Sequence, residues 1–432
     1  MKRLFGKALL IFGVWALWVL PIFSSSEAGE VLKIGLITGL TGGTASWGKQ
    51  VQDMAQLIGE EIKEAGGFKV GGKRVRVDFK IYDSESNPTV AATQTEKAIT
   101  EGCKIIMAGP QSAVDFTASE HCERAGVIYV NAYNVLDKLA ERGYEYYFRT
   151  CGDISVYVKE AMKYFLWQEK RTGVKAKKVA IFTNENVVCS FAGEKYFELI
   201  PKMAPHWDIV GNKVATYPKD VKDFTLWLSR YKSEGVDLFL AIRYPSDAIL
   251  FARQLRQMDY NPLALHGVLG GEYDPEYGQT LKWQCLYVTD TAYFSPMLKL
   301  PGLDEFNKKY KARYGTDIPN NAANLACAIT VIKDAVERAG SLDEKSLLSA
   351  LRSTDIRRLG YEKGKWWFII PEGCKFNKKG ENIRIRGVTT MWVDPETQVP
   401  VFPSEFATEV APWPRPSWKQ LEKEFGQKYP LK

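Results

Sequence analysis

The stretch GTASWGKQ, at residues 43–50, comes close to spelling a phosphate-binding loop. Gly43, Gly48 and Lys49 stand where the pattern G-x-x-x-x-G-K-[ST] requires them. The last position of that pattern offers a hydroxyl to Mg²⁺, and here it is Gln50, whose amide is a poor substitute. A glycine-rich loop entering a helix also brings backbone N–H groups close to an anionic group. We therefore expect this loop to contact an anionic ligand and not to hydrolyse a nucleotide.

The residue types that most often carry catalysis or bind metals are sparse and scattered. The three histidines, His121, His206 and His266, are far apart, and neither H-E-x-x-H nor G-x-S-x-G occurs in the sequence. The seven cysteines form no C-x-x-C, and their odd number favours buried free thiols over a disulfide framework. The sequence therefore predicts no catalytic residue, no metal site and no cofactor.

The N-terminus has the pattern of a secretory signal peptide. Three basic residues in the first seven positions precede an apolar run over residues 9–23, and Ser26 and Ala28 place small residues before a cleavage site. The alternative is a retained membrane anchor, which a run shorter than about 20 residues disfavours. Residues 1–28 are thus predicted to direct export from the cytoplasm, and outside it a nucleotide hydrolase would find little ATP.

Charge and composition are those of an ordinary globular protein. Hydrophobic residues make up 45% and charged residues 25% of the 432 positions, which indicates a folded chain long enough for two lobes. The 58 basic and 51 acidic residues are interspersed. The net charge of +7 therefore indicates a solvated surface and no nucleic-acid partner.

Strands and helices alternate along most of the chain. The first series predicts strands at 31–38, 74–83, 103–109 and 127–131, with helices from 49, near 88–101 and near 114–125. The second series predicts strands at 178–183, 208–217, 236–242 and 263–268, with helices near 191–203, 221–234 and 247–258. Alternation of this kind gives parallel sheets with right-handed crossovers, so the fold class is α/β with two doubly wound parallel-sheet lobes.

The remaining elements set the expected domain organisation. A strand at 286–293, three helices within 304–352, strand-like pieces near 366–370 and 383–393, and a Pro- and Trp-rich tail with a short helix at 418–425 follow in order. We expect lobe one to comprise residues 29–150 plus 290–365, lobe two 151–289 plus 366–400, and a surface wrap 401–432. The hinge is expected near 150–155 and 284–291.

Parallel sheets bind ligands outside the carboxyl ends of their strands, so the loops that follow each strand supply the candidate site. Trp47 in the first loop offers a flat wall, and Ser112 has a hydroxyl and adjacent N–H groups suited to a carboxylate. From the opposite lobe, Tyr244 contributes a ring and Glu272 an acid that pairs with an ammonium group. The alternatives are a helix cap for Ser112, loop packing for Trp47 and a solvated Glu272.

Around these residues the chain resembles the periplasmic substrate-binding proteins of branched-chain amino-acid (Leu/Ile/Val-type) ABC transporters. The matching stretches are IGLITGLTGGTASWGKQVQDMAQLIGEEIKEAGG, YDSESNPTVAATQTEKAI, IMAGPQSAVDFTASEHCERAGVIYVNA, LAERGYEYYFRT, KDFTLWLSRYKSEGVDLFLAIRYPSDAILFARQLRQ and GGEYDPEYG. The resemblance implies the type I periplasmic-binding fold, a Venus-flytrap architecture of two lobes joined by a hinge. It also implies that Ser112 holds a ligand carboxylate, while Trp47 and Tyr244 wall the site.

Other site positions depart from the family pattern. The run Tyr133, Asn134, Val135 stands where the family often has small, small and Thr, and Val188 lies in a loop where a tyrosine is common. The family's acidic partner of the ligand ammonium aligns near Gly270, so Glu272 takes that role only if the loop is shifted. A larger, aromatic or amine-free carboxylate is therefore an alternative to an amino acid.

The expected function is reversible capture of a small carboxylate, with a branched-chain or related amino acid as the first choice. Ligand binds one lobe and then contacts the second, which favours the closed state. The resemblance implies a monomeric receptor that delivers its ligand to an ABC permease and its ATPase. A ligand-sensing partner of a membrane receptor is the alternative with the same fold, and an enzyme is disfavoured because no catalytic motif is present.

Overall fold

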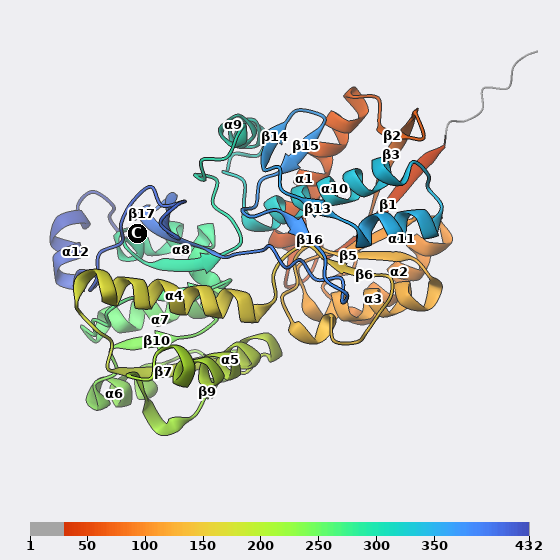
Figure 1. The fold of residues 1–432 in the computed structure, drawn as a ribbon. Helices are drawn as coiled ribbons and strands as arrows, with labels where there is room; N and C mark the ends of the chain where they lie inside the picture. Colours follow the sequence, from red (N-terminus) through yellow and green to blue (C-terminus); the bar gives the residue numbers. More distant parts are fainter. Residues whose placement is uncertain (1–29, 432) are drawn as a thin grey trace, which may run out of the picture.

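The computed structural model describes residues 30–431, which form two α/β lobes lying side by side (Figure 1). The predicted signal peptide, residues 1–28, lies outside the described residues. Within them, no helix combines the length and the apolar character that crossing a bilayer requires. The predicted fold class, two lobes built on parallel-rich sheets, is confirmed.

The first lobe is built on a six-stranded sheet in the order β2-β3-β1-β4-β5-β6, in which only the β2–β3 pair is antiparallel. Strands β4 and β5 are buried along their whole length, as expected for parallel strands covered on both faces. The strands are β1 (Val31–Thr38), β2 (Phe68–Val70), β3 (Lys73–Asp83), β4 (Ile105–Ala108), β5 (Ile128–Asn131) and β6 (Tyr147–Arg149).

Six helices flank this sheet. Helix α1 buries the apolar positions that the sequence placed on one face, among them Met54, Ile58 and Ile62. It is followed by Gly66 and Gly67 at positive φ, where a side chain at Gly67 would collide with the Val75 carbonyl. The helices are α1 (Ala45–Glu64), α2 (Pro88–Thr100), α3 (Ser112–Ala125), α9 (Leu303–Tyr314), α10 (Asn320–Ala339) and α11 (Glu344–Arg352).

The second lobe holds two four-stranded sheets joined by a single bridge between Leu238 and Ala264. In the first of them β7 pairs in parallel with β8, β9 and β10, and the second has the order β11-β12-β17-β18. The strands are β7 (Lys178–Asn184), β8 (Asp208–Ile209), β9 (Ala215–Tyr217), β10 (Leu238–Leu240), β11 (His266–Val268), β12 (Thr289–Ala292), β17 (Val388–Asp394) and β18 (Thr397–Phe402).

The helices of the second lobe include one that the sequence interpretation missed. Helix α4 begins after Asp153, whose side chain accepts the Val156 N–H at 2.8 Å, and ends at Gly173 in the left-handed conformation. The strand predicted at 208–217 is also interrupted, because Gly211 and Asn212 adopt positive φ between β8 and β9. The helices are α4 (Ile154–Thr172), α5 (Val187–Met203), α6 (Thr225–Glu234), α7 (Pro245–Gln257), α8 (Pro275–Leu281) and α12 (Trp418–Phe425).

Two small hairpin-like pairs complete the first lobe. The pairs are β13 (Asp355–Ile356) with β16 (Cys374–Lys375), and β14 (Gly360–Glu362) with β15 (Trp366–Phe368). The Trp367 indole and the Tyr361 hydroxyl both donate to the Glu61 carboxylate on α1, at 2.8 Å each. Residues 366–375 therefore pack on lobe one, although the sequence division grouped them with lobe two. Strand β12, most of which that division placed in lobe one, pairs with β11 and β17 in a sheet of lobe two.

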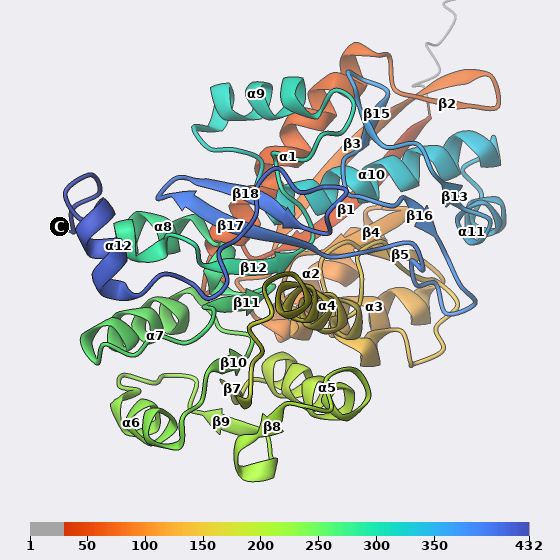
Figure 2. The same cartoon turned by 60° about the vertical axis from the view of Figure 1, so that its left-hand side comes forward.

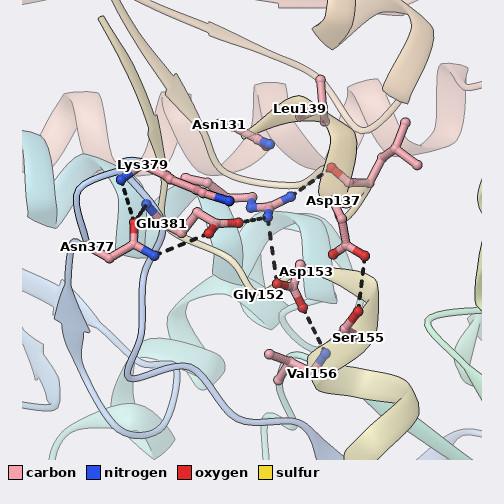
Figure 3. A network of polar contacts seen from close by, with 12 residues as sticks. Asn131, Asp137, Leu139, Gly152, Asp153, Ser155, Val156, Asn377, Lys379 and Glu381 are labelled. Carbon is pink, nitrogen blue, oxygen red and sulfur yellow. Dashed lines mark hydrogen bonds and ion pairs between the residues drawn. The ribbon is translucent and has the colours of Figure 1, made fainter. Parts of the chain in front are cut away.

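The chain crosses between the lobes three times, at residues 150–153, 293–302 and 376–387. The first and third crossings are tied together by Arg149, which pairs with Glu381 and donates to the Leu136 carbonyl at 2.9 Å (Figure 3). Ser155, just after the first crossing, donates to Asp137 at 3.1 Å. The second crossing follows β12 and so comes later than the sequence prediction of 284–291.

Candidate functional site

A cavity of about 880 Å³ lies between the two lobes. It is lined by segments that follow the carboxyl ends of β1, β4 and β5 in the first lobe and of β7, β10 and β11 in the second. Figure 2 shows the second-lobe strands β11, β12, β17 and β18 side by side in one sheet. The two parallel sheets thus direct their ligand-binding edges toward one shared space, as the rule for open α/β sheets requires.

Ser112 lines the cavity as the first residue of α3 and does not cap that helix. The N-cap is Gln111, which makes no side-chain capping bond, so the first N–H groups of α3 have no cap from it. The Ser112 hydroxyl lies 3.3 Å from the Asn134 side-chain oxygen and is half-buried. A hydroxyl beside free helix N–H groups is suited to a carboxylate.

Trp47 lines the same cavity from the third position of α1, which begins four residues earlier than predicted. The preceding loop is anchored because Ser86 accepts the Thr44 N–H at 3.0 Å. A side chain at Gly48 would collide with the Gly39 carbonyl, so the close approach of loop and helix needs glycine here. Lys49 pairs with Asp53 on α1, and the resemblance to a phosphate-binding loop ends with that pairing.

Tyr133, Asn134 and Val135 follow β5 and are buried at the cavity wall. The side-chain oxygen of Asn131 accepts the N–H groups of Tyr133 and Asn134 at 2.9 and 2.8 Å, which fixes this turn. The Asn134 amide donates to the Gly109 carbonyl at 3.1 Å. Its side-chain oxygen therefore faces Ser112 from a rigid position.

The wall contributed by the second lobe is apolar at Val188 and Tyr244, and Arg243 and Lys219 also line it. Val188 lies in the first turn of α5, and Tyr244 precedes α7 as its N-cap. The rings of Trp47 and Tyr244 meet across the cavity, with centroids 6.5 Å apart. This contact joins the two lobes directly at the ligand cavity.

Glu272 is not among the residues that line the cavity. It is 3% exposed and accepts a hydrogen bond from the Arg243 guanidinium at 2.8 Å. Burial raises the pKa of Glu272, and Arg243 opposes that shift. Asp290 lies close by and accepts the backbone N–H groups of Leu269 and Gly270, the loop that lines the cavity. The predicted partner of a ligand ammonium is thus an internal brace of lobe two.

A buried carboxyl group also lies behind the lobe-one wall. Asp115, in the first turn of α3, is fully buried and accepts a hydrogen bond from the Tyr129 hydroxyl. Burial raises the pKa of Asp115 to about 7. In lobe two burial lowers the pKa of His266 to about 3, so this histidine is neutral at physiological pH.

Among the cavity residues that were absent from the predicted site are two tyrosines and two lysines. Tyr273 and Tyr293 add rings, and Lys138 and Lys219 add positive charge, one lysine from each lobe. Tyr273 follows the Gly270-Gly271 loop that had been identified, but only the fold shows that its side chain reaches the cavity. Among residues 30–431 no group of three His, Cys, Asp or Glu side chains is arranged to hold a metal ion.

The sequence was compared with protein families and with curated proteins. The family described as "Periplasmic binding protein" matches residues 31–368. The Leu/Ile/Val-binding protein homolog 3 of Brucella melitensis is 28% identical over 335 residues, covering 75% of this chain and 84% of the relative.

Solved structures give the same fold. The leucine binding protein LivK of Thermotoga maritima has a TM-score of 0.69 at 22% identity, covering 85% of this chain and 97% of the other. A solute binding protein of Rhodopseudomonas palustris, solved with 3,4-dihydroxybenzoic acid, has a TM-score of 0.67 at 19% identity, covering 90% and 99%. The predicted family resemblance is thereby confirmed.

Proposed function

Since the chain belongs to the periplasmic binding protein family, we propose that it is the extracytoplasmic solute-binding protein of an ABC importer. It binds a small carboxylate between two closing lobes and delivers it to a membrane permease and its ATPase. The observation that carries this proposal is the single cavity bounded by the strand ends of both sheets. A binding cleft shared by two lobes couples occupancy to lobe closure.

The relatives support a small carboxylate as the ligand class. The Thermotoga neighbour is called a leucine binding protein, and the Rhodopseudomonas neighbour was solved with an aromatic acid. Leucine and 3,4-dihydroxybenzoic acid both carry a carboxylate, which is the group that Ser112 and the first turn of α3 are suited to hold. The ligand therefore docks on lobe one through its anionic end.

Closure brings the second lobe onto the docked ligand. Trp47 and Tyr244 approach from opposite lobes, so a ligand that fills the cavity contacts both sides at once. Contacts made only in the closed state supply the differential affinity that drives closure. The permease recognises the closed form, and no chemical change of the ligand is required.

Location and organisation follow from the same proposal. Residues 1–28 act as a cleaved signal peptide, and the mature chain works as a monomer in the periplasm. Lobe one comprises residues 29–150 and the segment from 293 to about residue 386, which includes β15 and β16. Lobe two comprises the intervening residues and β17–β18, with 401–432 wrapped on its surface.

Ligand binding with closure is tested by a thermal-shift screen of amino acids, aromatic acids and short aliphatic acids, followed by calorimetry. A ligand should raise Tm and reduce the radius of gyration in X-ray scattering, because the open lobes come together. Mass spectrometry after long incubation should recover the ligand unchanged. A changed ligand, or tight binding without any compaction, would contradict the proposal.

A further inference from the structure

The cavity between the lobes carries charge of one sign only. None of the residues that line it, within the described chain, is Asp or Glu. Lys138 from lobe one and Lys219 from lobe two are exposed at the cavity, and neither forms an ion pair with another described residue. A cleft lined by positive charge concentrates anions and disfavours a ligand that also carries an ammonium group.

Three acidic residues close to the segments that line the cavity are already engaged. Glu272 is buried against Arg243, and Asp290 accepts two backbone N–H groups behind the Leu269–Gly270 loop. Asp274 caps helix α8 by accepting the Glu276 N–H at 2.9 Å, and it lines a separate hollow beyond Trp47. An ammonium group enclosed in the main cavity would therefore be desolvated without a carboxylate partner, which is strongly unfavourable.

Helix ends reinforce the positive character. Helices α3, α5 and α7 all begin at the cavity, at Ser112, Val187 and Pro245. The N-terminus of a helix carries a partial positive charge, so three such ends favour an anion and oppose a cation in the same space. Together with the two lysines they form a site for a negatively charged ligand.

Size and wall chemistry indicate the rest of the ligand. About 880 Å³ lies within the range of pockets that hold drug-sized molecules and leaves much space around a single branched aliphatic side chain. The lining is rich in aromatic rings, which stack on planar apolar groups with defined geometry. These rings belong to Trp47, Phe116, Tyr133, Tyr244, Tyr273 and Tyr293.

We propose that the ligand of this cavity is an aromatic carboxylate without an ammonium group. Its carboxylate docks at Ser112 and the start of α3, its ring lies against Trp47 and Tyr244, and the lysines steer it in. This inference rests on the function proposed above and narrows it from small carboxylates in general to one chemical class. It departs from an amino acid because no acidic group is available to pair with the amine.

Isothermal calorimetry with matched probes tests the ligand class on the full mature chain. Phenylacetate and 3-phenylpropanoate, which is phenylalanine without its ammonium group, should each bind at least about tenfold more tightly than phenylalanine, the factor expected for one uncompensated charged group, and phenylacetamide should not bind. Leucine should bind more weakly than its amine-free counterpart, 4-methyl-2-oxopentanoate. The same chain with phenylacetate should also become more compact in X-ray scattering.

The outcomes separate this inference from the proposed function. Tight binding of leucine or phenylalanine with compaction would overturn the inference and leave a solute receptor standing. Tighter binding of 4-methyl-2-oxopentanoate than of phenylacetate and benzoate would overturn the aromatic assignment alone. Binding of no carboxylate at all would overturn both.

Two sets of variants probe the charge argument directly. Lys138→Met and Lys219→Met should each slow phenylacetate association several-fold and weaken its salt dependence, whereas Lys213→Met, on an exposed loop away from the cavity, should not. Val188→Asp places a carboxylate at the cavity in a helix first turn, where acids are tolerated. This variant should lower the ratio of phenylacetate affinity to phenylalanine affinity. If the ratio is unchanged in a variant that folds normally by circular dichroism, the charge argument is overturned.

Discussion

The two walls of the cavity keep their polar groups in different places. On the lobe-one wall, the Ser112 hydroxyl, the Asn134 amide and the first turn of α3 face the ligand space. On the lobe-two wall, Val188 and Tyr244 face it, Arg243 lines it as a buried side chain, and Glu272 pairs with Arg243 behind the surface. The difference indicates a division of labour, in which lobe one recognises the anionic group and lobe two closes over the apolar part.

The contrast has a physical basis in how each lobe supports its wall. Lobe one presents the uncapped N–H groups at the start of α3, whose hydrogen-bond partners are to come from the ligand, which makes its wall selective. Lobe two supports the Leu269–Gly270 loop from behind through Asp290, so its wall is held in place by buried contacts. If this division is right, breaking the buried Arg243–Glu272 pair in lobe two should affect folding, and removing polar groups at the start of α3 in lobe one should affect binding.

The largest expected effect is on the lobe-two brace. Glu272→Ala leaves the Arg243 guanidinium buried and unpaired, which should destabilise the protein by about 3–5 kcal/mol and lower Tm in calorimetric unfolding. Adding Arg243→Met to that variant should restore part of the stability, because the unpaired charge is removed. Glu198→Ala, which breaks an exposed pair on α5, is the control and should leave Tm nearly unchanged. A Glu272→Ala protein as stable as the parent would show that the pair does not brace the lobe.

The buried titratable groups give the two lobes opposite pH dependences. Between about pH 6.5 and 3 the unfolded chain protonates His266 while the folded chain does not, so stability falls as pH falls, by up to about 1.4 kcal/mol per unit. Between about pH 4 and 7 the unfolded chain ionises Asp115 while the folded chain keeps it protonated, so stability falls as pH rises.

Tm measured across pH 4–7 on His266→Gln and Asp115→Asn checks these signs. The Tm of His266→Gln minus the Tm of the parent should become more positive as pH falls. The Tm of Asp115→Asn minus the Tm of the parent should become more positive as pH rises. Each variant serves as the control for the other, because both remove one buried titratable group. Differences that are independent of pH in both variants would contradict the burial argument.

Much of the framework was predictable from sequence because local patterns carry it. The strand at 31–38 and the helix at 418–425 have the predicted bounds, and in the structure the strand is a mostly buried apolar run and the helix begins after a Ser417 cap. Most candidate site residues meet at one cavity because parallel strands place their following loops at one edge. That inference needs only the order of strands and helices, and the periodicity of the sequence supplies it.

The tertiary features were beyond local patterns. Glu272 pairs with Arg243, 29 residues earlier in the chain, and no periodicity indicates that contact. The return of residues 366–375 to lobe one depends on Glu61, some 300 residues away. Helix α4 is a different case, because Ile154, Val158 and Ala161 have helical spacing, but the sequence interpretation assigned no element to residues 156–172. Long-range pairing therefore accounts for most of these differences between the predicted and the observed structure, and helix α4 for the remaining one.

Removing the lobe-one hydroxyl should weaken binding without affecting folding. Ser112→Ala should cost about 1–3 kcal/mol of carboxylate affinity in calorimetry, because a charge-assisted hydrogen bond is lost. Its Tm without ligand should match the parent, since Ser112 caps no helix. Thr93→Ala, which removes an exposed hydroxyl on α2, is the matched control for affinity. Equal affinities of Ser112→Ala and the parent would place the carboxylate elsewhere.

The smallest effect is expected at the lobe-two ring. Tyr244→Ala removes the contact with Trp47 and the face against which the ligand ring lies, which should cost about 0.5–1.5 kcal/mol of affinity. Tyr244→Phe keeps the ring and should bind like the parent. Because Tyr244 contacts the ligand only after the lobes close on it, the loss of affinity should appear mainly as faster dissociation in stopped-flow measurements. If Tyr244→Ala instead slowed association and left dissociation unchanged, the Tyr244 ring would contact the ligand before the lobes close, and the division of labour between the walls would fail.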